Sequence, residues 1–220
     1  MQIQWTNKLS ASDGIKHVNY GPSGIGKTRL IATATRPFIF NAEKGLLSLR
    51  KFNLPYVTIS SLKDLSDAYN WAMKSNETRN YDLFALDSIS EIAEVYLKDE
   101  LDQSKDARKA YGNMQQGMYE IIRNFRDLKQ KHVYFCAKQM FIVEGSGLES
   151  YRVATPIMPS EKLQAQLPYF FDLVTHHGME QTYEVLHCKT TKYFHAKDRS
   201  GNLNSIEEPN LAKLYAKCLK

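Results

Sequence analysis

The sequence has few cysteines, and they form no recognisable pair or cluster. Three occur among its 220 residues, an odd number without close spacing: Cys136, Cys188 and Cys218. This pattern excludes the disulfide framework of a small secreted protein and predicts reduced thiols in a cytoplasmic one. His187 and His195 flank Cys188 without the spacing of metal ligands, so the sequence gives little support to a zinc site.

Long apolar runs are also missing. No segment approaches the roughly 20 apolar residues that cross a bilayer, the polar start does not resemble a secretory signal, and no internal repeat occurs. Hydrophobic residues make up 43% and charged residues 24%, a balance that argues against extensive disorder. The net charge of +5 permits contact with nucleic acid without establishing it. We therefore expect a cytoplasmic globular protein with no membrane contact.

The most specific motif fits the phosphate-loop pattern of Gly, four residues, Gly-Lys and Ser or Thr. Its glycines tolerate the backbone angles that turn N–H groups inward around a triphosphate. Lys27 is expected at the β- and γ-phosphates, and the Thr28 hydroxyl at Mg²⁺. A predicted strand at 15–20 precedes the motif and a predicted helix at 28–35 follows it, so a chance Gly-rich turn is the less favoured interpretation. The predicted nucleotide-binding segment is Gly21-Pro22-Ser23-Gly24-Ile25-Gly26-Lys27-Thr28.

A second apolar strand ends in an acidic residue. The segment 81–88 reads Tyr-Asp-Leu-Phe-Ala-Leu-Asp-Ser and follows the phosphate loop by about 60 residues. A buried strand that ends in Asp is common, but at this distance from a phosphate loop it predicts the second half of the site. Asp87 is expected to hold Mg²⁺ through a water or through Thr28.

Hydrolysis also needs a carboxylate that orients or deprotonates the attacking water. Many ATPases that contain a phosphate loop carry Glu directly after the metal-binding Asp, whereas this sequence has Ser88. The better candidate is Glu43, just beyond a predicted strand at 37–41. Glu91 is a weaker candidate because it lies one turn into the next helix. A charge near a helix N-terminus is the alternative explanation for Glu43.

Two other polar groups follow predicted strands. Lys138 and Gln139 end the strand at 133–137, where a polar side chain can sense the γ-phosphate; a solvated strand end explains them equally well. Lys197 and Arg199 extend to the same side of a later strand end. They are either a solvated hairpin tip or cations that reach the γ-phosphate of a neighbouring subunit, as arginine fingers do.

Strands and helical patterns alternate along the chain, as in βαβ units. We expect an α/β fold: a mostly parallel central sheet flanked by helices, with a C-terminal antiparallel hairpin of 183–188 and 191–196 around Lys189-Thr190. We also expect a single domain over 1–220, with its core at about 15–203 and a closing helix at 210–219. Further helices are predicted at 62–74, at 89–101 and from about 113 to 129, and a further strand at 56–59.

These motifs resemble the RecA-like P-loop ATPases and, more narrowly, the phage-encoded, RecA-related single-strand-annealing (Sak-type) ATPases. Segment 38–43, Phe-Ile-Phe-Asn-Ala-Glu, looks like the strand that delivers the catalytic glutamate. Segment 83–88 looks like the Mg²⁺-binding strand, including the Ser after the Asp. Segment 133–139 is similar to the strand that couples nucleotide state to the second DNA-binding loop, although it carries Lys-Gln where RecA has Asn-Gln.

The resemblance covers about 15–203 and lacks the extra terminal domains of RecA. Lys197-x-Arg199-x-Gly201 is similar to the Lys-x-Arg pair that related ring ATPases insert into the adjacent subunit. The resemblance to these ATPases implies hydrolysis of ATP with Mg²⁺ in a homo-oligomeric ring or filament. The residues expected to act on the phosphates, the water or the neighbouring site are Lys27, Glu43, Gln139, Lys197 and Arg199, with Thr28 and Asp87 at the metal.

The resemblance further implies single-stranded DNA as partner, in phage recombination or replication with an annealing or strand-exchange role, and a single-strand-binding protein as a further candidate partner. The DNA loops would lie at 103–112 and 140–154, and the second also carries Glu144 and Glu149. Alternatives are a nucleotide-gated loader or regulator that does not touch DNA, and a small-molecule phosphotransferase, for which no Arg-rich lid is present. The candidate DNA contacts are Lys105, Arg108, Lys109 and Tyr111 in the first loop, and Phe141 and Arg152 in the second.

Overall fold

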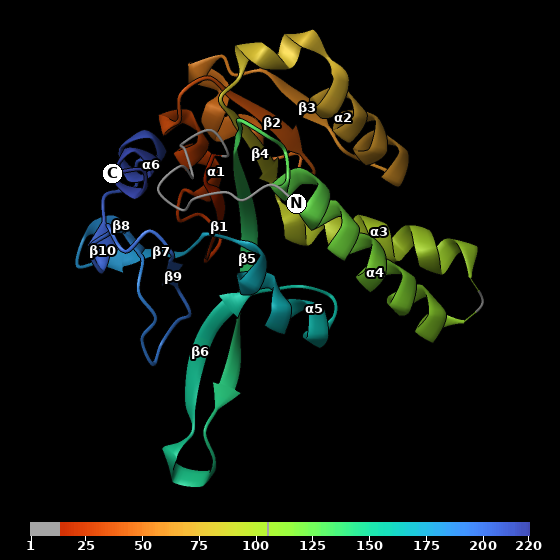
Figure 1. The fold of residues 1–220 in the computed structure, drawn as a ribbon. Coiled ribbons are helices and arrows are strands. Elements are labelled where there is room, and N and C mark those ends of the chain that lie inside the picture. Colours follow the sequence, from red (N-terminus) through yellow and green to blue (C-terminus); the bar gives the residue numbers. More distant parts are fainter. Residues whose placement is uncertain (1–13, 105) are drawn as a thin grey trace, which may run out of the picture.

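A single twisted sheet forms the centre of the protein (Figure 1). The computed structural model describes residues 14–104 and 106–220. The strand order along the sheet is β10-β8-β7-β1-β5-β4-β2-β3, while β6 pairs with β5 and β9 with β7. The strands are β1 Lys16–Gly21, β2 Pro37–Asn41, β3 Tyr56–Thr58, β4 Leu83–Asp87, β5 His132–Glu144, β6 Tyr151–Pro156, β7 Leu173–Glu180, β8 Tyr183–His187, β9 Lys197–Asp198 and β10 Ile206–Glu207.

The strands β3, β2, β4, β5, β1 and β7 run parallel, so their carboxyl ends meet at one edge. This edge carries the ends of β1, β4 and β2, after which the sequence places its phosphate loop, its acidic strand end and its candidate carboxylate. Ligands of open α/β sheets bind at such an edge. The predicted α/β fold with a mostly parallel sheet is confirmed.

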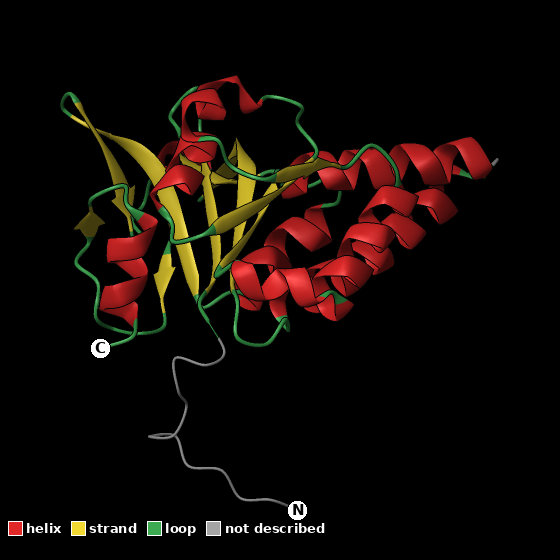
Figure 2. Cartoon of the chain, turned by 90° about the horizontal axis from the view of Figure 1, so that it is seen from above, coloured by secondary structure: helices red, strands yellow, loops and turns green. Residues whose placement is uncertain are grey.

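Helices cover both faces of the sheet (Figure 2). On one face, α2, α3, α4 and α5 pack against a core rich in aromatic side chains such as Phe40, Phe84 and Phe125. On the other, α1 and α6 pack on an aliphatic core that includes Leu30 and Leu211. The helices are α1 Lys27–Leu30, α2 Leu62–Lys74, α3 Ile89–Gln103, α4 Ala107–Arg126, α5 Glu161–Gln166 and α6 Leu211–Cys218. Within residues 14–104 and 106–220, none is long and apolar enough to span a membrane.

Most of the described residues in the two predicted DNA loops adopt regular structure instead. The segment 103–112 is the tip of a helical hairpin, and α4 begins at Ala107 because the Asp106 side chain accepts from the backbone N–H groups of its first turn. The segment 140–154 is mostly an antiparallel hairpin of β5 and β6, whose turn contains Gly145 and Gly147 at positive φ. Figure 1 shows this hairpin, which we call the arm, projecting from the sheet. The expectation of a long loop at 140–154 was wrong because β-branched and aromatic residues continue the strand period on both sides of the glycines.

The C-terminal antiparallel hairpin is present, but one strand earlier than predicted. It joins β7 to β8 through a turn at Gln181, which adopts positive φ. The segment 191–196 is not a strand. It forms a loop whose two ends are held together by Thr190, because the Thr190 hydroxyl donates to the carbonyl of Ala196 at 2.6 Å. The strand β7 was not predicted, because its apolar residues stop at Val174 and the strand continues through the polar residues 175–177, which do not resemble a buried strand.

Candidate nucleotide-binding site

The phosphate loop leaves the carboxyl end of β1 and enters α1. Gly24 and Gly26 adopt φ of 81° and 102°, values that residues with a Cβ rarely tolerate. A Cβ on Gly21 would stand 2.3 Å from the carbonyl oxygen of His177, so packing against β7 requires glycine there. The glycines therefore allow the backbone conformation that turns N–H groups toward a phosphate.

Lys27 lies along the inside of this loop. Its Nζ donates to the carbonyls of Gly21 at 2.9 Å and Pro22 at 2.8 Å. Both acceptors belong to the loop, so the ammonium group is held at the place where the β- and γ-phosphates of a nucleotide would lie.

Thr28 and Asp87 form the candidate Mg²⁺ site. The Thr28 hydroxyl donates to Asp87 Oδ2 at 2.7 Å. Asp87 Oδ1 is buried and lacks an ordinary hydrogen-bond partner among the described residues, the thiol of Cys136 being only a weak donor. Burial raises the pKa of Asp87, and the bond from Thr28 offsets this only in part. A buried carboxylate with an unmatched oxygen beside a hydroxyl suits Mg²⁺, whose preferred ligands are oxygens.

Glu43 is positioned next to Asp87 by both backbone and side chain. The N–H groups of Ala42 and Glu43 donate to the carbonyl of Asp87 at 2.7 and 3.1 Å. The Ser88 hydroxyl donates to Glu43 Oε1 at 2.5 Å. The geometry thus brings the exposed Glu43 carboxylate to the end of β4, beside the candidate metal site, where it could activate water. Glu91 instead accepts from Lys138 Nζ at 2.5 Å.

The two sensor candidates turn to different partners. Lys138 Nζ is held by Glu91 and by Glu94 at 3.2 Å. The Gln139 side-chain oxygen lies 2.9 Å from His176 Nε2, which places Gln139 against β7. The middle of β5 is also tied to α3, because Ser90 Oγ accepts from Lys138 N at 3.0 Å and donates to Ile157 O at 2.8 Å.

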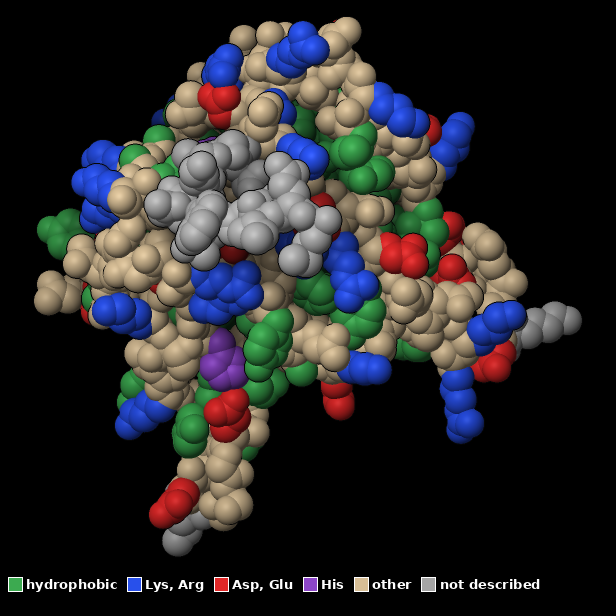
Figure 3. Space-filling model, in the orientation of Figure 1, with side chains coloured by type: hydrophobic (Ala, Val, Ile, Leu, Met, Phe, Trp, Pro, Cys, Tyr) green, Lys and Arg blue, Asp and Glu red, His purple; other side chains and the backbone are tan. Residues whose placement is uncertain are grey.

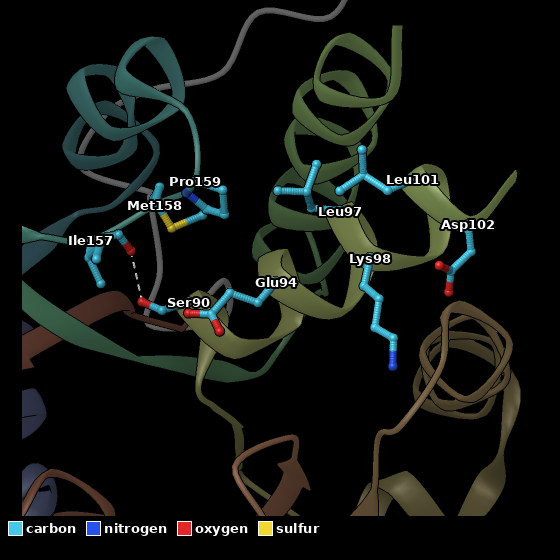
Figure 4. Close-up of a pocket in the computed structure, with 9 residues that line it drawn as sticks. All are labelled: Ser90, Glu94, Leu97, Lys98, Leu101, Asp102, Ile157, Met158 and Pro159. Atoms are coloured by element: carbon cyan, nitrogen blue, oxygen red, sulfur yellow. Dashed lines mark hydrogen bonds between the residues drawn. The ribbon is translucent and has the colours of Figure 1, made fainter. Parts of the chain in front are cut away.

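Figure 4 shows the Ser90–Ile157 bond at the wall of a groove between α3 and the segment 157–159. The groove contains none of the phosphate-loop residues. It is lined by Ser90, Glu94, Leu97, Lys98, Leu101, Asp102, Ile157, Met158 and Pro159.

Lys197 and Arg199 lie at the opposite edge of the sheet from their own phosphate loop. Leu173 pairs with Asp198 and also with His17, at the start of β1. That point is about 13 Å along the strand from Gly21. Lys197 Nζ donates to a carbonyl at 2.8 Å, and Arg199 Nη1 lies 3.3 Å from the Asp172 carboxylate. Neither cation reaches the loop of its own chain.

The candidate DNA contacts fall on two separate projections (Figure 1). Arg108, Lys109 and Tyr111 occupy the start of α4 at the tip of the helical hairpin. Lys105, expected beside them, lies outside the described residues. Phe141 and Arg152 are on the arm, on β5 and β6 respectively.

A chain of buried hydrogen bonds under the loop was missed by the sequence analysis. Asn19 Nδ2 donates to the Tyr134 hydroxyl at 2.8 Å, and that hydroxyl donates to the carbonyl of Lys27 at 3.0 Å. Burial lowers the pKa of His17 to about 3, so its ring is neutral. The chain therefore fixes the backbone at Lys27 from inside the core. From α6 to β5 its members are Tyr215, His17, Thr175, Asn19 and Tyr134.

The model of the AAA domain family matches residues 13–200. The chain belongs to the AAA domain family. It is accordingly a P-loop ATPase domain. A search of curated proteins finds no match.

Among solved structures, the AAA domain is similar to one described as a prototypical ATPase from the type III secretion system of pathogenic bacteria. The identity is 12%, the TM-score is 0.49, and the match covers 76% of this chain and 51% of that one. The chain thus spans about half the length of that ATPase. The family assignment rests on the family model.

Proposed function

We propose that this ATPase domain couples hydrolysis of Mg²⁺-ATP to the binding of single-stranded DNA by the arm, in phage recombination or replication with an annealing or strand-exchange role. The observation that supports the proposal is the continuity of β5. This strand pairs with Asp87 through Cys136, passes Gln139, and ends in the arm beside exposed Phe141. One rigid strand thus joins the metal-binding edge of the site to the proposed DNA contact.

In the proposed reaction, water attacks the γ-phosphorus, the bond from that phosphorus to the β–γ bridging oxygen breaks, and Glu43 accepts the proton of the water. Lys27 and the loop N–H groups stabilise the charge on the phosphate oxygens. Mg²⁺, held by Thr28 and Asp87, would supply further positive charge at the β- and γ-phosphates. Ser88 orients Glu43 by its hydrogen bond.

The arm offers side chains suited to bases and phosphates. Phe141 and Val143 are 56% and 68% exposed on alternate positions of β5, and Arg152 pairs in register with Val143. Alternate and directly paired residues share a face of a two-stranded sheet. A base can stack on Phe141 while Arg152 meets a phosphate, the combination typical of sequence-tolerant single-strand binding.

Completion of the site by a neighbouring copy is part of the proposal. Lys197 and Arg199 lie too far from their own phosphate loop to act on it, and cations at the far edge of one subunit can face the loop of the next. Such an arrangement generates a ring or a filament. A single-strand-binding protein remains a candidate partner of that assembly.

The charge of the arm favours a second candidate function. Glu144 and Glu149 outweigh Arg152 in charge, and Figure 3 shows acidic beside hydrophobic side chains on the visible face of the arm. An acidic, apolar projection suits a protein surface better than a phosphate backbone. The second candidate is therefore a nucleotide-gated loader or regulator whose arm docks on a protein.

Single-strand binding by fluorescence anisotropy, repeated across salt concentrations, tests the proposal. Phe141→Ala should weaken binding roughly 5- to 150-fold, since stacking of one base is worth about 1–3 kcal/mol. Tyr56→Ala is a matched control, because Tyr56 is 57% exposed on edge strand β3. The rate of ATP turnover should be higher in the presence of the DNA than in its absence. Binding that is unaffected by Phe141→Ala, or whose affinity does not change with salt, favours the second candidate.

A further inference from the structure

Arg29 and Glu184 meet beside the phosphate loop. Both oxygens of Glu184 accept from Arg29 Nη2. Arg29 Nη2 and Glu184 Oε2 each lie 3.1 Å from the position that a Cβ on Gly26 would occupy. Arg29 directly follows Thr28 in the chain, whereas Glu184 comes from β8. A guanidinium group thus stands at the edge of the phosphate cradle with its charge already matched by a carboxylate.

A second donor for Glu184 lies in the core. His177 on β7 is fully buried, and its Nε2 has no hydrogen-bond partner among the described residues. That nitrogen lies 3.9 Å from Glu184 Oε2, just outside hydrogen-bond reach.

The neighbours of His177 fix which of its nitrogens carries the proton. Asn19 Nδ2 lies 3.4 Å from His177 Nδ1, and an amide NH₂ group can only donate. The Asn19 side-chain oxygen accepts from the Thr175 hydroxyl at 2.8 Å, which sets the orientation of that amide. Burial lowers the pKa of His177 to about 4, so the ring is neutral. Nδ1 is then the acceptor, and Nε2 carries a hydrogen that no described residue accepts, with Glu184 Oε2 3.9 Å away.

We propose that Arg29 is a phosphate ligand that leaves Glu184 when nucleotide binds, and that the freed Glu184 carboxylate takes the hydrogen bond of His177 Nε2–H. The inference rests on the proposed binding of ATP in the phosphate loop. Phosphate competes well for Arg29, because a guanidinium binds phosphate oxygens at least as well as it binds carboxylate. The Arg29–Glu184 pair is weak enough to exchange, since the two side chains are 50% and 31% exposed.

The exchange would report nucleotide occupancy to the β7–β8 hairpin. Glu184 pairs in register with Met179, two residues beyond His177 on β7. In one arrangement the carboxylate ties β8 to Arg29 on α1, and in the other it ties β8 to the buried His177 of β7. These are two discrete partners for one side chain, which is what a nucleotide-dependent switch requires.

ATP affinity in a double-mutant cycle tests the exchange. Glu184→Gln removes the carboxylate that competes for Arg29 and should tighten ATP binding roughly two- to five-fold. Arg29→Ala should weaken binding roughly ten- to hundredfold. In the Arg29→Ala background, Glu184→Gln should no longer tighten binding. The control is Asp82→Asn, which breaks the Arg36–Asp82 pair of similar exposure at the opposite edge of the sheet and should leave ATP affinity unchanged.

The imidazole of His177 gives a readout that a merely structural pair would not move. In ¹⁵N-labelled wild-type protein, the Nε2–H signal of His177 should shift downfield on addition of ATP, and should not do so in Glu184→Leu, whose side chain cannot accept a hydrogen bond. Wild-type protein that binds ATP with no such shift and no tightening by Glu184→Gln overturns the inference while the ATP site stands. Wild-type protein that does not bind ATP at all would instead contradict the proposed function.

Discussion

Replacing Ser88 by Ala separates the catalytic part of the site from its architecture. The Ser88 hydroxyl has two partners: it donates to Glu43 Oε1 at 2.5 Å, and it accepts from the backbone N–H of Glu91 at 3.3 Å as the N-cap of α3. Neither hydrogen bond involves the phosphate loop. Ser88→Ala should therefore disturb the orientation of Glu43 and the start of α3 while leaving ATP binding nearly unchanged.

The two contacts have different expected magnitudes. A lost Ser N-cap costs about 1 kcal/mol, which lowers the melting temperature of a chain of this size by roughly 2–4 °C. A hydrogen bond to a charged group is worth roughly 1.5–3 kcal/mol. If that bond holds Glu43 in its reactive orientation, its loss lowers kcat by about 10- to 150-fold.

Phosphate release at saturating Mg²⁺-ATP measures kcat, and thermal unfolding measures the lost cap. Ser61→Ala is the matched control, because Ser61 caps α2 by accepting from Asp64 N at 3.1 Å rather than bonding to Glu43. It should lose similar stability at unchanged kcat. Equal stability losses in both variants together with unchanged kcat in Ser88→Ala would refute the positioning of Glu43 by Ser88.

Three further predictions concern the loop, the far edge and the core. Lys27→Ala should abolish phosphate release, and substantial remaining turnover would contradict the loop assignment. Arg199→Ala should bind ATP normally but not hydrolyse it, and mixing it with Glu43→Gln should restore turnover; altered ATP affinity with intact turnover would show that Arg199 does not act in trans. Below pH 6.5 the free energy of unfolding should fall by about 1.4 kcal/mol per pH unit from His17 alone, because its folded-state pKa of about 3 leaves it neutral where the unfolded chain takes up a proton. Urea unfolding of His17→Gln between pH 6 and 4 should show that much less slope, and an unchanged slope would contradict the prediction.

The sequence could predict the parts of the site that lie within one motif. The phosphate loop depends on positive backbone φ angles at Gly24 and Gly26. Such angles can be predicted from the sequence because glycine adopts them far more readily than other residues. The candidate roles of Asp87 and Glu43 came from the ends of buried strands, because parallel strands bring their carboxyl ends to one edge. The helix α2 was predicted with its observed bounds from its apolar spacing alone, and in the structure the Ser61 side chain caps its start.

The rest depends on which strands become neighbours, and a single sequence does not contain that information in local form. Glu184 lies 155 positions from Arg29, and only the order β8-β7-β1 brings them together. His17 and Asn19 did carry a signal, since two polar residues on the same face of a buried strand need partners. Their partners on β7, β5 and α6 could not be read from the sequence. The arm was taken for a loop because its glycines outweighed the strand pattern of Phe141 to Val143.

Phosphate release from a preformed Mg²⁺-ATP complex of Glu43→Gln, followed over a single turnover, tests the central claim most directly. If Glu43 activates the water at a site formed by Lys27, Thr28 and Asp87, the variant binds ATP as tightly as wild type and releases phosphate roughly 10²- to 10⁴-fold more slowly. Release at the wild-type rate from a fully bound complex would contradict the account.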